Sequence, residues 1–223
     1  MKTTSLTDAL PELMIALGET AWMSIWAFLI TLVLGMIAGI GLRLTAPDGM
    51  TPRRAFHQLF GAVVNLTRSL PFLILLIVLI PFTRFVVGTA YGPTAAIVPL
   101  AVGAIPFYAR VVESAVREVA QGKIEAAQSM GASTWQIVRK VLIPEAMPGL
   151  VAGATLTLVT LIGYSTMAGA IGGGGVGDFA IRYGYQRFNG PVLLASVVVL
   201  IVIVQAVQMI GDAVVRSMNH KRG

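Results

Sequence analysis

Five long apolar stretches alternate with polar segments along the chain. Because a bilayer core takes about 20 consecutive apolar residues per helix, each stretch indicates one membrane span. The expected spans are Thr20–Leu42, Leu66–Val86, Pro93–Val112, Pro148–Ile171 and Pro191–Val215. The pattern therefore predicts an all-α integral membrane protein with five transmembrane helices.

The composition supports a membrane protein and excludes several other classes. Of the 223 residues, 56% are apolar and 12% are charged, with a mean hydropathy of +0.82, whereas soluble domains carry about 25% charged residues. The absence of cysteine excludes disulfides, thiolate nucleophiles and Cys-based metal sites. His57 and His220 alone cannot build a histidine metal site, so we expect no metal on this chain.

A net charge of +6 can indicate nucleic-acid binding, but no soluble region here is long enough to fold such a module. We therefore interpret the basic residues as markers of membrane topology. Lys and Arg concentrate in cytoplasmic loops. Eleven of them share one side of the five-span arrangement, namely Arg43, Arg53, Arg54, Arg110, Arg117, Lys123, Arg139, Lys140, Arg216, Lys221 and Arg222. Four lie on the other side, namely Lys2, Arg84, Arg182 and Arg187. This asymmetry predicts an external N-terminus and a cytoplasmic C-terminus.

The same arrangement divides the chain into an external segment (1–19), a membrane domain (20–215) and a cytoplasmic tail (216–223). The longest cytoplasmic connection, 113–147, joins the third and fourth spans. Asp8, Glu12 and Glu19 stand where a signal peptide would carry basic residues. The first span is therefore expected to remain as an anchor.

The second expected span contains a proline and an arginine near its start. Pro71 removes a backbone hydrogen bond and predicts a kink. Arg68 either reaches the cytoplasmic interface or points into the helix bundle, and its place near the predicted helix start favours the interface.

Two pairs of glycines at a four-residue spacing, Gly35 with Gly39 and Gly149 with Gly153, indicate close helix packing. Packing inside one subunit is the simpler interpretation, and contact between subunits is the alternative.

The long cytoplasmic connection predicts two short helices. Glu, Ala and Gln favour a helix from Lys123 to Met130, which Gly131 would end in a left-handed conformation. Ser133 with Gln136 forms a capping box for a second helix that runs to about Ile143, where Pro144 is expected to stop it.

The first of these helices is expected to expose Ala126 and Ala127 beside Glu125. Small side chains permit close approach of a partner helix, and the neighbouring charges can orient it. An amphipathic hairpin lying on anionic lipid accounts for these residues equally well.

The spacing in this segment resembles a known family. Glu125-Ala126-Ala127, three residues, Gly131, nine residues and then Val141-x-Ile143-Pro144 is similar to the EAA loop of ATP-binding-cassette (ABC) importer permeases. The family pattern ends in I-x-L-P, so Val and Ile are conservative departures. The resemblance implies that these seven residues couple the chain to an ATPase.

Further segments resemble the permeases of methionine importers, which have five spans in the type I ABC importer fold. They include Arg68-Ser-Leu-Pro-Phe, Gly103-Ala-Ile-Pro-Phe and Tyr183-Gly-Tyr-Gln. The resemblance implies a homodimer in the bacterial inner membrane, two cytoplasmic ATPase subunits that carry ATP and Mg, and an external methionine-binding lipoprotein. Import of L- and D-methionine is then expected, with no cofactor on this chain.

Two alternatives remain open at this level. The same fold could carry another small amino acid or a related solute, because the external protein partly sets the substrate. An ATPase-independent channel or secondary transporter would need no partner.

The chain lacks the residues for chemistry of its own. It has no G-x-x-x-x-G-K-[ST] loop to hold ATP phosphates, and no Lys-Ser/Thr follows the glycine run Gly172–Gly175. Ser165 has no base within reach, since both histidines lie near the opposite face. We therefore expect no catalytic residue.

Polar residues are unusually frequent in the fourth span, which is the candidate lining of a translocation pathway. Tyr164, Ser165 and Met167 are the candidate pathway or gate residues, because a flexible Met among small residues suits a yielding plug. Hydrogen bonding to neighbouring helices is the alternative role for such polar residues.

Overall fold

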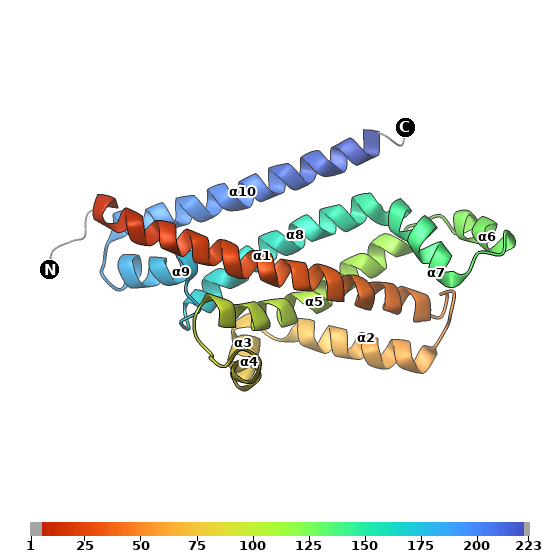
Figure 1. Ribbon diagram of the computed structural model, residues 1–223, viewed down its shortest axis with the longest axis horizontal. Helices are drawn as coiled ribbons and strands as arrows, with labels where there is room; N and C mark the ends of the chain where they lie inside the picture. Colours follow the sequence, from red (N-terminus) through yellow and green to blue (C-terminus); the bar gives the residue numbers. More distant parts are fainter. Residues whose placement is uncertain (1–5, 221–223) are drawn as a thin grey trace.

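The computed structural model describes residues 6–220, and within them it is built from helices without strands. The first five residues of the expected external segment and the last three of the expected tail lie outside this range. Four long helices run along the molecule (Figure 1): α1 (Leu6–Thr45), α5 (Pro93–Arg117), α8 (Ile143–Gly169) and α10 (Gly190–His220). The start of α1 lies at one end of the molecule, and α10 runs from that end toward the other, stopping short of α6 and α7.

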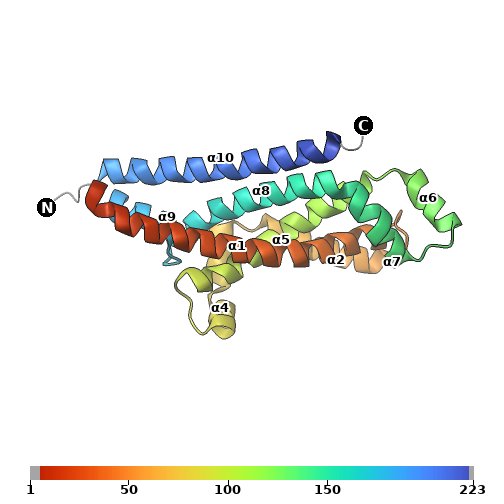
Figure 2. The same cartoon turned by 45° about the horizontal axis from the view of Figure 1, so that its top comes forward.

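Shorter helices complete the fold. They are α2 (Arg54–Ser69), α3 (Phe72–Val78), α4 (Ile80–Val87), α6 (Gln121–Ser129), α7 (Thr134–Ile137), the π-helix η1 (Val138–Leu142), α9 (Gly175–Phe179) and the π-helix η2 (Ala180–Tyr185). In Figure 2, α4 projects from the side of the bundle, and α6 and α7 form the end opposite α9.

The helices confirm an all-α membrane architecture. Within residues 6–220, four segments are long and apolar enough to cross a bilayer, and the bent pair α2–α3 brings the number to five. The predicted starts of the third and fifth spans agree with α5 and α10 to within one residue.

The first helix starts earlier than its sequence indicates. It begins at Leu6, whereas the expected span begins near Thr20, so the helix continues into the expected external segment. Ala9, Leu13 and Ala16 are buried in one cluster with Val176, Phe179 and Val192. This packing continues the helix through a stretch that is too polar to be recognised as part of a span.

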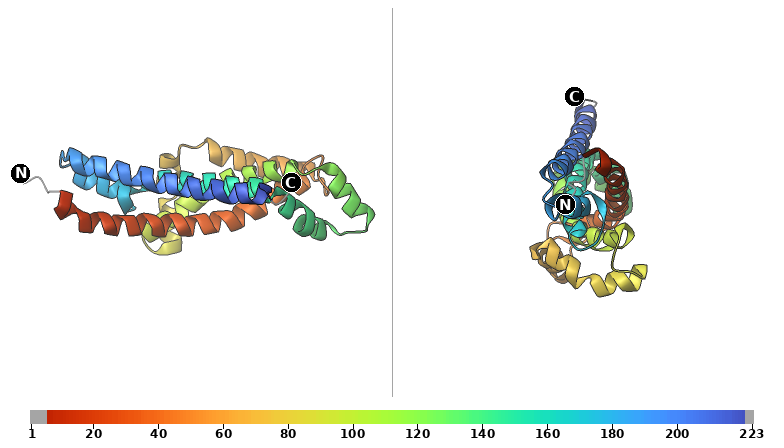
Figure 3. Two further views of the ribbon diagram at one scale, coloured as in Figure 1. Left: turned by 90° about the horizontal axis from the view of Figure 1, so that it is seen from above. Right: turned by 90° about the vertical axis from the view of Figure 1, so that its left-hand side faces the viewer.

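Helix α5 is central and α10 is peripheral. In the most apolar part of each helix, 56% of α5 is buried but only 6% of α10. The end-on view in Figure 3 places α10 at one edge of the bundle and the α3–α4 region at the opposite edge.

Both glycine pairs pack against α5 within the chain. A Cβ added at Gly39 would lie 2.6 Å from Cβ of Val112, and one added at Gly149 would lie 3.1 Å from Cβ of Ala115. The predicted close packing inside one subunit is confirmed.

The second expected span is broken rather than kinked. Helix α2 already begins at Arg54, and α3 turns away from it by 106°. Leu70 and Pro71 between them are extended, with ψ of 132° and 130°. A residue that precedes proline is disfavoured in the α region, and Pro71 lacks the N–H needed to continue the ladder. The expected span Leu66–Val86 is therefore wrong, although Pro71 marks the break.

The expected stop at Pro144 is also wrong. The segment Thr134–Gly169 runs as one continuous helical span through η1 into α8. Pro144 stands in the first turn of α8, where a missing N–H is tolerated. The π-helix η1 directly before it has i→i+5 rather than i→i+4 backbone hydrogen bonds, so the hydrogen-bond pattern shifts just ahead of the proline.

Candidate functional site

The segment between α5 and α8 folds as a bent helix pair with defined ends. Gly131 ends α6 with φ of +75°, and its N–H donates to the Gln128 carbonyl at 2.9 Å. The capping box is formed in both directions: the Ser133 N–H donates to the Gln136 side chain at 2.8 Å, and the Gln136 N–H donates to the Ser133 hydroxyl at 3.4 Å. The predicted Gly131 conformation and capping box are confirmed.

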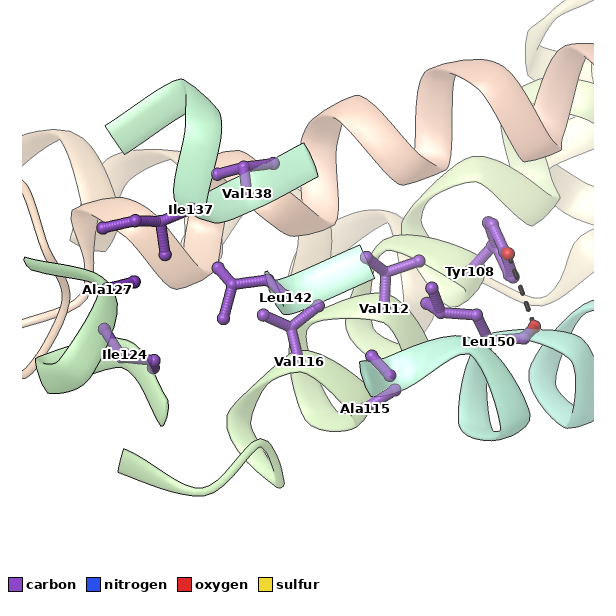
Figure 4. Close-up of a cluster of buried hydrophobic side chains, with 11 residues drawn as sticks. Tyr108, Val112, Ala115, Val116, Ile124, Ala127, Ile137, Val138, Leu142 and Leu150 are labelled. Carbon is purple, nitrogen blue, oxygen red and sulfur yellow. Dashed lines mark hydrogen bonds between the residues drawn. The ribbon is translucent and has the colours of Figure 1, made fainter. Parts of the chain in front are cut away.

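A single apolar cluster joins this helix pair to the membrane helices. Figure 4 shows Ile124 and Ala127 of α6 gathered with Ile137, Val138 and Leu142. The cluster continues without a gap to residues of α5 and α8, namely Tyr108, Val112, Ala115, Val116, Ala146 and Leu150. The helix pair is thus packed on α5 and α8 through one continuous apolar contact.

The exposed face of α6 differs in part from the expectation. Glu125 and Ala126 are exposed, but Ala127 is 5% exposed and packs inward, so its expected exposure is wrong. Successive residues on a helix are about 100° apart, and only one of two adjacent alanines can face away from the cluster. Met130 and Trp135, which the sequence did not single out, are 81% and 69% exposed and flank Gly131.

The remaining residues of the EAA-like pattern lie at the junction with α8. Val141 and Ile143 are half-buried against the apolar cluster, and Pro144 is exposed. Nearby, Nζ of Lys123 lies 2.8 Å from Oε1 of Glu145 and connects α6 to the first turn of α8.

A buried charge network ties α2 to α5. The Glu113 side chain, 4% exposed, accepts from Arg110 at 2.6 Å and from Arg117 at 3.0 Å. Arg110 also donates to the Gly61 carbonyl at 3.1 Å and to the Asn65 side chain at 3.0 Å. A buried carboxylate needs such partners to offset its desolvation. Glu113 directly follows Val112, the expected end of the third span, and the sequence did not single out these partners.

The break between α2 and α3 borders a cavity of about 170 Å³. Arg68 lines it from the last turn of α2, and Gly103 and Phe107 line it from α5. Tyr164 of α8 closes another side and stacks on Phe72, with ring centroids 4.1 Å apart and planes 5° apart. The expected position of Arg68 at the start of a span is wrong, because α2 begins at Arg54.

The three candidate pathway residues of α8 have different surroundings. Tyr164 borders the cavity, and Met167 is 46% exposed. Ser165 is buried, and its hydroxyl donates to the Ile162 carbonyl at 2.7 Å. The chain thus brings Tyr164 to an open space, exposes Met167 and turns Ser165 toward its own helix.

The glycine run after α8 forms a tight turn. Gly172, Gly174 and Gly175 have φ between 77° and 86°, the left-handed region. Glu19 of α1 accepts from the Gly175 N–H at 2.7 Å. The first helix thereby anchors the loop.

Charged groups outside the cavity have structural roles. A hydrogen bond from Arg182 to Asp178 raises the pKa of Arg182 above its usual range. Nδ1 of His57 lies 3.0 Å from the Leu42 carbonyl, an ordinary structural contact. In the part of the chain that the structure describes, no group of three His, Cys, Asp or Glu side chains could hold a metal ion.

Comparisons with known proteins agree with this geometry. Residues 31–222 match the family model described as "Binding-protein-dependent transport system inner membrane component". The chain is 50% identical to the probable D-methionine transport system permease protein MetI of Vibrio cholerae, over 94% of this chain and 93% of that protein. It is 48% identical to the methionine import system permease protein MetP of Bacillus subtilis, over 81% of each.

Solved structures show the same fold. A chain from the inward-facing MetNI methionine ABC transporter, native crystal form, matches with a TM-score of 0.91 at 47% identity, over 92% of this chain and 95% of that one. A chain from an amino acid ABC transporter crystallised with histidines matches with a TM-score of 0.78 at 18% identity, over 97% and 99%. The second match supports the fold alone, and the first confirms the expected importer permease fold.

Proposed function

The chain belongs to the family of binding-protein-dependent transport system inner membrane components, and from this premise we propose that it is the membrane subunit of an ATP-driven importer of methionine. It is not itself an enzyme. Two copies of the chain form the transmembrane part, two cytoplasmic ATPase subunits bind ATP and Mg, and an external binding lipoprotein delivers the substrate.

The observation that carries this proposal is the packing of α6 and α7 on the membrane helices. One apolar cluster contains residues of α5, α6, α7, η1 and α8. A partner that binds the exposed face of α6, at Glu125 and Ala126, therefore moves α5 and α8 with it. Closure of the ATPases becomes a rigid-body movement of the spans, and access alternates between the two sides of the membrane.

The distribution of basic residues supports the orientation. Lys123, Arg139 and Lys140 lie on the segment that joins α5 to α8, and cytoplasmic loops are enriched in such residues. We place this end in the cytoplasm, where the ATPases are, and the Gly172–Gly175 loop outside. The segments 1–19 and 216–223 then lie outside and inside, respectively.

The substrate assignment rests on the relatives. Those from Vibrio cholerae and Bacillus subtilis are named as methionine transport permeases. At 48–50% identity over most of the chain, the helices that surround a pathway are shared closely enough to carry the same class of solute. Both enantiomers are within this proposal.

Uptake of labelled methionine tests the proposal. Cells that lack this chain are compared with cells in which it is restored, and a third strain carries the chain with an ATPase subunit that cannot hydrolyse ATP. Restored uptake that disappears in the third strain is the expected result. An assembled complex that takes up no methionine would refute the substrate, and uptake that persists without ATP hydrolysis would refute the importer mechanism.

A further inference from the structure

The cavity at the break between α2 and α3 contains a charged group at an unusual depth. Arg68 shares its wall with Gly103 and Phe107 of α5. At 1.5 Å per residue, these two lie about 15 Å and 21 Å from the start of α5, a helix about 37 Å long. Arg68 therefore lies near the middle of the membrane-spanning part rather than at an interface.

Nothing within the described residues neutralises this guanidinium. No carboxylate between residues 6 and 220 lies within ion-pair distance of Arg68, whereas Arg110 and Arg182 each have one. Ionisable side chains at such depth face a bundle interior or a water-filled space and mark substrate or ion pathways. The space is present here, and it holds several times the ~30 Å³ that a water molecule occupies in the liquid.

We propose that Arg68 binds the carboxylate of an α-amino acid in this cavity, which forms a substrate subsite inside the membrane domain. A guanidinium pairs with a carboxylate through two parallel N–H···O bonds. The Thr67 hydroxyl donates to the Val63 carbonyl at 2.9 Å, so its oxygen keeps lone pairs for a substrate ammonium group. The inference rests on the proposed function for the choice of methionine.

The other walls fit an apolar side chain. Phe72, Phe107 and Tyr164 present aromatic surface to the same space, and thioether sulfur makes favourable contacts with aromatic rings. The volume of about 170 Å³ is below the ~300–1,000 Å³ of sites for drug-sized ligands, as expected for a single amino acid.

The subsite also connects to the moving part of the molecule. Tyr164 belongs to α8, whose N-terminal end is packed against the α6–α7 pair. Its ring stacks on Phe72 of α3. A movement of α8 therefore changes one wall of the cavity and can release a bound amino acid.

Direct binding tests the inference. The purified complex of permease and ATPase subunits, without the external binding protein, is titrated with radiolabelled L-methionine. We expect saturable binding of methionine. The analogue 4-(methylthio)butanoate, which keeps the carboxylate, should displace it, whereas 3-(methylthio)propylamine, which lacks the carboxylate, should not. Equal displacement by both compounds would overturn the proposal without any mutation.

Matched arginine variants provide the second arm. Arg68 and Arg84 both stand in the last turn of a helix and are exposed, but only Arg68 lines the cavity. Arg68→Ala is expected to weaken binding at least tenfold, Arg68→Lys to weaken it less, and Arg84→Ala to leave it unchanged. Equal binding by the Arg68→Ala and Arg84→Ala complexes would overturn the proposal.

The substrate and the subsite fail in distinguishable ways. If the wild-type complex neither imports nor binds methionine, the proposed substrate is wrong, and the same variants are compared with a panel of labelled amino acids. Loss of binding of any of these in Arg68→Ala still supports the subsite. A wild-type complex that binds none of them overturns it.

Discussion

Nζ of Lys123 lies 2.8 Å from Oε1 of Glu145, which links the helix expected to meet the ATPase directly to the first turn of α8. Both side chains are partly exposed, at 53% and 35%, so the pair adds at most about 1 kcal/mol to folding. The pair adds a polar contact between α6 and α8 beside the apolar cluster that joins them.

Reversal of one charge in this pair is expected to impair coupling. Lys123→Glu places two carboxylates together and should lower ATP-dependent uptake by up to about fivefold, the equivalent of about 1 kcal/mol. The double variant Lys123→Glu/Glu145→Lys should restore most of the loss. Uptake in proteoliposomes measures both, and a double variant no better than the single one would argue against the pair.

Substitution of Gly131 is expected to be unfavourable, for a backbone reason. No atom lies within 4 Å of a Cβ added at Gly131 or at Gly122, but only Gly131 has a positive φ, of +75°. Gly131→Ala should destabilise the local backbone conformation by about 1–2 kcal/mol. Gly131→Pro should abolish uptake, because it also removes the N–H bonded to Gln128.

Gly122→Ala is the matched control for Gly131, since an exposed helical Gly→Ala change is neutral or slightly stabilising. Membrane insertion, measured by protease accessibility, should be normal in all three variants. Normal uptake by Gly131→Pro would remove the coupling role of this segment.

Glu113 should be essential for stability rather than for transport chemistry. Glu113→Ala leaves Arg110 without its buried partner, and breaking a buried ion pair costs about 3–5 kcal/mol. Thermal unfolding of the purified complex should therefore begin at a clearly lower temperature. Glu118→Ala, an exposed acidic neighbour on the same segment, should unfold like the wild type, and equal effects of the two changes would contradict the network.

Close packing predicts different effects for two glycines of α1. A Cβ at Gly39 would meet the backbone of Ala109 and the Cβ of Val112, whereas a Cβ at Gly41 has nothing within 4 Å. Gly39→Ala should destabilise the chain by about 1–3 kcal/mol through overpacking, and Gly41→Ala should not. The yield of folded permease measures the difference, and two equal yields would show that α1 and α5 separate more readily than the packing indicates.

The orientation can be checked by thiol labelling, because the chain has no cysteine. Met130, which directly follows α6, and Phe188, which lies between η2 and α10, are 81% and 92% exposed, and α6 and the start of α10 lie toward opposite ends of the molecule. A membrane-impermeant maleimide added outside intact cells should label Phe188→Cys and not Met130→Cys. The reverse pattern would invert the proposed topology.

Local rules predicted local features correctly. The capping box of Ser133 and Gln136 and the left-handed Gly131 follow from side-chain reach and backbone sterics within a few residues. The start of α5 at Pro93 follows in the same way, since proline suits a first helical position. These features need no knowledge of the rest of the fold.

Features set by distant contacts could not be predicted. The extension of α1 back to Leu6 depends on packing against Val176 and Phe179, which are remote in sequence. The burial of Ala127 and the partners of Glu113 likewise arise only when α6 and α5 are folded together. Of the candidate site, the pattern of residues could be recognised, but not which of them face outward.

The π-helix η1 sets the rotational phase between the two functional ends of one continuous span. An i→i+5 segment holds one more residue than an α-helix of equal length, and each residue turns a helix by about 100°. Val138–Leu142 thus allows the face that α7 turns toward a partner and the face that α8 turns toward the cavity to be aligned independently. Insertion or deletion of a single residue here would therefore rotate α7 relative to the side of α8 that borders the cavity, with the sequence of both helices unchanged.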